Sequence, residues 1–305
     1  MSVKITITGD LGSGKSTVCG ELRKKYGLQI FSTGTIQRKI AAEMGMSTFD
    51  LNKHSESNPE IDELIDGELI KLSDFQDDIA IDSRMAWHFV NNTFNVFLTT
   101  DETIAAQRVM SDLRGPTEEY TDVQHAKELL KARKASENLR YNQKYGVNCC
   151  DLSNYDLIVD TTDISPECVA DVIMEQYDKR DTNRTDPIFL ISPLCLYPTQ
   201  NIRATSMDTI DKYVSMISDG ENINPVDIIF ANGFFFIYDG HHRISAYFRS
   251  KKALVSCIML AQNQEKVAGG MSAGQYANRE FNLSKAHDWE ELNTFRYLTY
   301  PSEVV

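Results

Sequence analysis

The most informative residues of the chain form a glycine-rich loop near its N-terminus. Residues Gly9–Ser16 read GDLGSGKS, which satisfies the phosphate-loop pattern G-x-x-x-x-G-K-[ST] between a predicted strand and a predicted helix. Glycines let the backbone wrap around phosphates, so that its N–H groups and the helix N-terminus bind the anion. We expect Lys15 to reach the β- and γ-phosphates and Ser16 to ligate Mg²⁺. The residues expected to bind ATP and Mg²⁺ here are Gly9, Gly12, Ser13, Gly14, Lys15, Ser16 and Thr17.

Two later segments place arginines where a second phosphate could bind. Phe31–Arg38 puts Arg38 one turn into a predicted helix, directly after a loop of small residues. Ile81–Trp87 carries Asp82 and Arg84 at the end of a buried strand, the usual place for active groups in a parallel sheet. Phosphoryl transfer between two nucleotides brings two polyanions together, so cations from separate segments suit that task.

A third segment carries charges at helical spacing. Arg133, Glu137 and Arg140 are spaced i, i+4 and i+7, so they share one face of a predicted helix. Periodicity alone favours a solvated helix stabilised by salt bridges. The alternative is that these side chains bind a nucleotide or its phosphates.

Alternating strand and helix patterns position these motifs. We predict strands at residues 3–8, 28–31, 79–82, 95–98 and 155–160, and helices at 15–26, 36–44, 59–72, 105–113, 123–141 and 166–177. Repeated strand–helix alternation predicts an α/β fold, with a parallel sheet and helices on both faces. The first domain is expected to span residues 1–180.

The second half predicts a smaller α+β domain at residues 187–305. A polar stretch at 178–187 has almost no apolar content and predicts a linker. Strands are expected at 188–191, 226–230, 234–238 and 255–260, with an Asn-Gly turn at 232–233 that suits a hairpin. Helices are expected at 207–217, 243–250 and near 288–295, within a weakly patterned segment from residue 261 to the end.

The first half resembles cytidylate kinase, particularly the short form common in archaea. The resemblance covers Gly9 to about Tyr177. It includes the phosphate loop, the S-x-G-x-x-x-R pattern that ends at Arg38, DSR-x-AW from Asp82, and R-x-x-SE-x-x-RY from Arg133. It implies ATP and Mg²⁺ as cofactors, and CMP or dCMP as the phosphoryl acceptor.

The resemblance also implies roles for individual residues. Arg38 and Arg84 would hold the acceptor phosphate, while Arg133 and Glu137 would contact the cytidine nucleotide or the transferring phosphate. Asp82 would lie near Mg²⁺ or the acceptor, and Arg108 would contact ATP. The residues implied in catalysis are Lys15, Asp82, Arg84, Arg133 and Arg140. The residues implied in substrate binding are Ser32, Gly34, Arg38, Arg84 and Glu137. The predicted lid departs from the family at 110–114, where Arg114 is the candidate for a missing second arginine.

A second resemblance covers about residues 187–262. The segment Asp239–Arg243 reads DGHHR and opens a predicted helix, which is a plausible anion site. It is similar to the ParB/sulfiredoxin fold, including its free-serine kinases, and implies nucleotide binding by Asp239, Gly240, His241, His242 and Arg243. The sulfiredoxin cysteine is replaced by His241, and Gln200 lies near the position of the serine kinases' catalytic Glu. The alternative is two surface histidines beside a capping turn.

Composition narrows the classes of partner. The formal net charge is −13, so binding of DNA would require a local basic patch, and none is evident in the sequence. No apolar run is long enough for a transmembrane helix. The six cysteines form neither a zinc pattern nor a disulfide framework, which favours reduced thiols in the cytoplasm.

We therefore expect a two-domain cytoplasmic nucleoside-monophosphate kinase that converts CMP or dCMP to the diphosphate. Two alternatives stay open. One is a kinase for serine or a modified nucleotide, and the other is a nucleotide-sensing regulatory protein with weak kinase activity. The sequence leaves the oligomeric state open.

Overall fold

The chain folds as two compact units, Met1–Pro187 and Ile188–Val305. The computed structural model describes residues 2–46, 50–51, 54, 58–111, 120–180, 186–201 and 206–301. Part of the predicted linker, residues 181–185, lies outside the described residues, as does Arg114 of the predicted lid. We describe each unit by itself.

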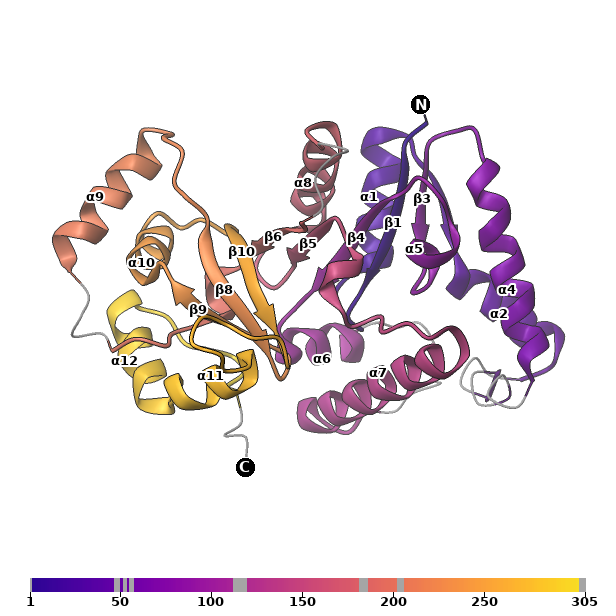
Figure 1. Cartoon of the computed structure of the whole chain (residues 1–305). Coiled ribbons are helices and arrows are strands. Elements are labelled where there is room, and N and C mark those ends of the chain that lie inside the picture. Colours follow the sequence, from indigo (N-terminus) through magenta and orange to yellow (C-terminus); the bar gives the residue numbers. More distant parts are fainter. Residues whose placement is uncertain are drawn as a thin grey trace. The chain divides into compact units, whose positions relative to one another are not determined.

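Unit 1 contains a parallel five-stranded sheet in the order β2-β3-β1-β4-β5 (Figure 1). Its strands are β1 (Lys4–Gly9), β2 (Gln29–Ser32), β3 (Ile79–Asp82), β4 (Phe94–Thr99) and β5 (Leu157–Asp160). Every residue of β1 is buried, which shows that both faces of this central strand are covered. The predicted α/β class with a parallel sheet is confirmed.

Seven α-helices lie in the described part of unit 1. They are α1 (Lys15–Tyr26), α2 (Thr33–Glu43), α4 (Pro59–Lys71), α5 (Ala86–Phe89), α6 (Glu102–Ser111), α7 (Val123–Tyr145) and α8 (Pro166–Asp178). Short 3-10 turns lie at Leu72–Asp74 and Leu152–Asn154. Helix α7 continues one turn beyond the predicted end, because Gly146 in a left-handed conformation ends it there.

Unit 2 contains a mixed sheet in the order β6-β10-β8-β9-β7. Its strands are β6 (Ile188–Ile191), β7 (Leu196–Tyr197), β8 (Val226–Ala231), β9 (Phe234–Asp239) and β10 (Val255–Gln262). Strands β8 and β9 form the predicted hairpin, and both turn residues, Asn232 and Gly233, have positive φ.

Four helices belong to unit 2, with a 3-10 turn at Pro193–Cys195. They are α9 (Met207–Ser218), α10 (His241–Arg249), α11 (Ala273–Glu280) and α12 (Leu283–Asn293). Helix α11 was not predicted, and α10 and α12 begin earlier than predicted. None of the helices described in either unit is both long and apolar enough to cross a lipid bilayer.

Candidate functional site

The carboxyl ends of the parallel strands in unit 1 border a cleft of about 690 Å³. The loop after β1, the end of β3 and the helices α2, α4 and α7 all contribute lining side chains. The cleft is lined by the predicted residues Gly12, Ser13, Gly14, Lys15, Ser16, Thr17, Ser32, Gly34, Arg38, Asp82, Arg84, Arg108, Arg133, Glu137 and Arg140. The fold therefore brings together motifs that lie far apart in the sequence.

Two of the three glycines of the phosphate loop lie where no side chain fits. A Cβ on Gly9, whose φ is 144°, would lie 2.1 Å from the carbonyl oxygen of Leu98. A Cβ on Gly12, whose φ is 77°, would lie 2.6 Å from the carbonyl oxygen of Ala105. Glycine at both positions lets the loop pack closely against β4 and α6.

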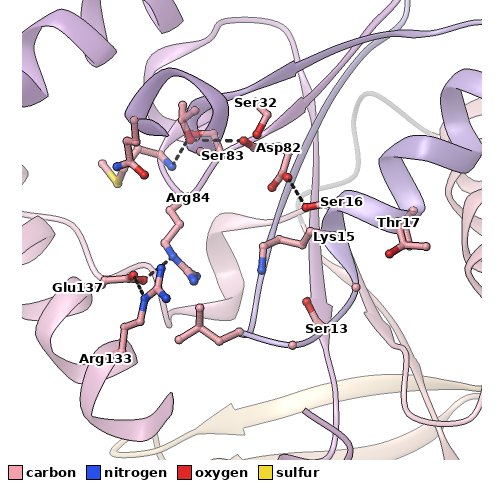
Figure 2. Close-up of a pocket in the computed structure, with 18 of the residues that line it drawn as sticks. Ser13, Lys15, Ser16, Thr17, Ser32, Asp82, Ser83, Arg84, Arg133 and Glu137 are labelled. Carbon is pink, nitrogen blue, oxygen red and sulfur yellow. Dashed lines mark hydrogen bonds and ion pairs between the residues drawn. The ribbon is translucent and has the colours of Figure 1, made fainter. Parts of the chain in front are cut away.

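Lys15 and Ser16 begin α1 and point into the cleft (Figure 2). The Lys15 ammonium donates to the carbonyl oxygens of Gly9 at 3.0 Å and of Asp10 at 2.7 Å. Burial, with a further contribution from the Arg84 guanidinium, lowers the pKa of Lys15 to about 8. The Ser16 hydroxyl donates to Asp82 Oδ2 at 3.1 Å. The hydroxyl and carboxylate oxygens are hard ligands of the kind Mg²⁺ prefers.

A charged network joins the end of β3 to α7 (Figure 2). Arg84 Nε lies 2.5 Å from Glu137 Oε2, and the Arg84 guanidinium donates to the carbonyl of Gly9 at 2.9 Å. Arg133 Nε donates to Glu137 Oε1 at 2.9 Å. Burial alone would raise the pKa of Glu137, but Arg84 and Arg133 outweigh it and hold the pKa below its ordinary value. The predicted salt bridge on this helix face is present, and Arg133, Glu137 and Arg140 also line the cleft.

The other predicted arginines differ in how firmly they are held. Arg38 is exposed and donates to Thr35 Oγ1 at 3.0 Å. Arg140 lies against the ring of Tyr141, with its guanidinium carbon 5.1 Å from the ring centroid. Arg108 donates to Thr161, at 2.7 Å to the carbonyl and 3.1 Å to the hydroxyl. Burial lowers the pKa of Arg108.

One ion pair of the phosphate loop was not predicted. Lys134 Nζ lies 2.6 Å from Asp10 Oδ1, and Thr99 donates to Asp10 Oδ2 at 2.9 Å. Burial alone would raise the pKa of Asp10, but Lys134 holds it below its ordinary value. This pair fixes α7 against the loop. The acidic residue Asp10 within the GDLGSGKS loop indicated that a cation could pair with it. The sequence could not identify that cation, because Lys134 lies 124 positions away.

The predicted anion site in unit 2 has a different character. His241 is only 3% exposed, and its Nε2 accepts from the backbone N–H groups of Thr199 at 3.1 Å and Gln200 at 3.3 Å. Burial lowers its pKa to about 3, so the ring is neutral at physiological pH. His242 Nε2 accepts from the backbone N–H of Ser206 at 2.9 Å. The interpretation of both histidines as surface residues is wrong for His241.

Arg243 is held by groups within unit 2. Its guanidinium donates to the carbonyls of Asn224, at 3.0 Å, and of Pro225. It also lies 2.7 Å from the Asp239 carboxylate, which is largely exposed. Gly240 precedes the helix with a φ of 106°, and a Cβ there would lie 2.9 Å from that same guanidinium. In the described part of the chain, no group of three or more His, Cys, Asp or Glu side chains is arranged to hold a metal ion.

Known proteins resemble this chain mainly over unit 1. A cytidylate kinase of Thermoplasma volcanium is 36% identical over 181 residues, which cover 58% of this chain and 92% of that protein. An S-adenosylmethionine-dependent nucleotide dehydratase of Lacinutrix mariniflava is 29% identical over 239 residues, which cover 77% of this chain but only 49% of that protein. Because 239 residues exceed the length of unit 1, that alignment extends into unit 2.

Among solved structures, a sulfiredoxin of Arabidopsis thaliana covers 24% of this chain and 82% of its own, at 16% identity and a TM-score of 0.22. That likeness is too weak to carry an argument about unit 2. The model of the cytidylate kinase-like family matches residues 4–163, which is more than half of the chain and includes the phosphate loop and the whole of the charged network. The chain therefore belongs to the cytidylate kinase-like family.

Proposed function

We propose that unit 1 transfers the γ-phosphoryl group of ATP to the phosphate of CMP or dCMP, in the cytoplasm. The observation that carries the proposal is that one cleft joins the phosphate loop to arginines of α2, of the segment after β3 and of α7. A phosphate loop alone would serve many nucleotide hydrolases. A cleft that also holds cations from other segments suits a second polyanion beside the first. The six cysteines are free thiols, which supports a reducing compartment.

Lys15, Arg84 and Arg133 would bind phosphates by exchanging their present hydrogen-bond and ion-pair partners for phosphate oxygens. In the structure Lys15 and Arg84 donate to backbone carbonyls of the phosphate loop, and Arg84 and Arg133 share Glu137. Bound phosphates would replace the carbonyl partners of Lys15 and Arg84, because a hydrogen bond from a cation to a phosphate is stronger than one to a neutral carbonyl. Lys15 would then stabilise charge on the transferring group, while Arg38 and Arg84 orient the acceptor phosphate.

Ser16 and Asp82 would hold Mg²⁺ together with the ATP phosphates. Mg²⁺ usually takes one or two protein ligands besides phosphate oxygens and water, which fits a hydroxyl and a carboxylate in direct contact. When bound, the ion would neutralise charge on the phosphates.

A nucleotide acceptor is favoured over serine. The relatives that match both halves of unit 1 are named for cytidylate, and the relative whose alignment reaches unit 2 is named for a nucleotide. Tyr141 and Tyr145 also line the cleft, and aromatic rings suit a base better than a small amino acid.

The direct test is release of ADP by the full chain, with ATP, Mg²⁺ and one acceptor at a time. The acceptors are CMP, dCMP, UMP, AMP and serine. The proposal expects turnover with CMP or dCMP and none with serine. Turnover of serine alone would support the first alternative, and none above background would support the regulatory one.

We also propose that unit 2 binds a nucleotide at the start of α10 and does not bind duplex DNA. The left-handed Gly240 precedes a helix that has no side-chain cap, and the uncapped N–H groups of such a helix start would stabilise a phosphate. His242 and the exposed Asp239 flank this position, and Arg243 would have to leave Asp239 to contact a phosphate. Calorimetry on the full chain carrying Lys15→Ala would count the nucleotide sites that remain, with ATP, ADP, CDP and CTP as ligands. Loss of a residual site in His242→Ala is expected, and DNA binding at physiological salt would contradict the proposal.

A further inference from the structure

An ion pair beside the phosphate loop joins the loop to helix α7. Lys134 Nζ lies 2.6 Å from Asp10 Oδ1, and the hydroxyl of Thr99 donates to Asp10 Oδ2 at 2.9 Å. The Asp10 side chain is only 17% exposed, so water screens its charge poorly. Among the described residues, Asp10 and Lys134 line a small second cavity of about 20 Å³ rather than the cleft of about 690 Å³. The pair is therefore placed to act on a ligand of the cleft through its charge and not by contact.

A carboxylate within a phosphate loop is electrostatically unfavourable for the ligand. Such a loop binds phosphates with oriented N–H groups and a cation, and an anion within it would repel them. Asp10 is also close to the cation of the loop, because the Lys15 ammonium donates to the Asp10 carbonyl at 2.7 Å. An unpaired Asp10 carboxylate would therefore repel a phosphate and also compete with it for Lys15.

Lys134 is in place to cancel the charge of Asp10. The Asp10 carboxylate raises the pKa of the Lys134 ammonium. Burial opposes ionisation of Asp10, but the Lys134 ammonium outweighs it and lowers the pKa of Asp10. Both groups are therefore charged at neutral pH, and together they carry no net charge. Thr99 cannot replace Lys134 in this respect, because a hydroxyl donates a hydrogen bond without carrying a charge. Arg133, the preceding residue of α7, pairs with Glu137 in the cleft instead (Figure 2).

We propose that Lys134 enables ATP binding by neutralising Asp10, so that the phosphate loop presents only its N–H groups and Lys15 to the phosphates. The inference rests on the ATP site proposed above for unit 1. Lys134 acts through Asp10, and it is a positioning residue rather than a ligand. The alternative is a mechanical role, in which the ion pair only fastens α7 to the loop. The two roles differ in the effect of removing both charges together.

The test measures the Kd for ATP by calorimetry on the full chain, at the site that Lys15→Ala removes. Lys134→Met leaves the Asp10 carboxylate uncompensated, so we expect the Kd to rise by about 10- to 100-fold. Adding Asp10→Asn removes the anion, so the double variant should return to within about threefold of the wild-type Kd. Asp10→Asn alone should lower the Kd by about two- to tenfold, because it leaves a cation beside the loop.

Two further variants serve as controls. Lys134→Arg keeps the charge and should bind ATP as the wild type does. Lys131→Met is the matched control, because Lys131 is exposed on the same helix and pairs with Glu102 at 2.9 Å. It should leave the Kd unchanged.

The outcomes separate this inference from the mechanical role and from the proposed function. A double variant that binds ATP as weakly as Lys134→Met would overturn the inference in favour of the mechanical role. An unchanged Kd in Lys134→Met would overturn it as well. If Lys134→Met does not fold, as judged by circular dichroism, weaker binding by Asp10→Asn decides against it instead. A wild-type chain that binds ATP but phosphorylates no acceptor would overturn the proposed function and leave this inference standing. A chain that binds no ATP in unit 1 would overturn both.

Discussion

Helices α1 and α10 begin alike in sequence and differently in chemistry. Each follows a strand and a glycine in the left-handed conformation, Gly14 with φ 83° and Gly240 with φ 106°. Neither helix has a side-chain cap, and basic residues follow both glycines. By sequence pattern, both are candidate phosphate sites.

Tertiary contacts separate them. Lys15 lines a cleft of about 690 Å³, and its ammonium donates hydrogen bonds to two backbone carbonyls of the phosphate loop. Under the proposed function, phosphates of a bound nucleotide would replace these carbonyls. His241 is buried as an acceptor for two backbone N–H groups, and Arg243 holds two carbonyls and a carboxylate. The two helix starts therefore differ in which donors a ligand can reach: at α1 the Lys15 ammonium lines the cleft, whereas at α10 His241 and Arg243 already have partners within unit 2.

The largest expected effect is that of Lys15→Ala on phosphoryl transfer. Removing a cation from the transferring phosphate should lower kcat by about 10²- to 10³-fold, because such stabilisation is worth about 3–4 kcal/mol. Lys24→Ala is the matched control, since Lys24 is exposed on the same helix and pairs with Glu21. Wild-type turnover by a folded Lys15→Ala enzyme would show that the start of α1 does not act in phosphoryl transfer, and the contrast with α10 would then be lost.

Arg38→Ala should act on the acceptor alone. Arg38 is exposed in the cleft and makes one hydrogen bond to Thr35, so its loss should not disturb the fold. We expect kcat/KM for CMP to fall by about 10- to 100-fold, as for a charged hydrogen bond, with unchanged affinity for ATP. Calorimetry gives that affinity, and Lys39→Ala is the neighbouring control. An equal loss in ATP affinity would contradict the acceptor assignment.

Arg243→Ala should reduce stability without affecting turnover. It leaves two carbonyls and a carboxylate without their guanidinium, which should cost about 1–3 kcal/mol of unfolding free energy. Urea unfolding would be followed by the fluorescence of Trp289, in a Trp87→Phe background that removes the tryptophan of unit 1. An unchanged free energy of unfolding would show that these contacts do not stabilise unit 2, and it would remove the contrast with Lys15.

The smallest expected effect is a dependence of ATP affinity on pH. Lys15 has a pKa of about 8 in the structure, so its ammonium is increasingly lost as the pH rises from 7 to 9. Because ATP favours the cation, binding should take up protons in this window. The Kd should therefore rise by up to about tenfold per pH unit above 8. Calorimetry in buffers of different ionisation enthalpy measures that uptake, and Lys15→Arg should abolish it.

Local patterns predicted most of the elements of unit 1 because its strands are short apolar runs bounded by clear helix signals. Helix α1 was predicted with its full bounds, Lys15–Tyr26, since a phosphate loop precedes it and Gly27 ends it. In unit 2, α11 was missed although Ser272 and Gln275 form a capping box, a local signal that was present. Its low apolar content concealed it.

The sequence by itself determined the phosphate loop, the strand–helix alternation and the candidate arginines, because each depends on residue types at fixed local spacing. Only the tertiary structure decided which of these side chains share a cleft and which are already satisfied. Lys134 meets Asp10, Tyr145 meets Asp66, and Arg243 meets the carbonyl of Asn224, across separations of 124, 79 and 19 residues. Such pairings depend on how distant segments pack, and packing fixes both the access of a ligand and the partner of each charge.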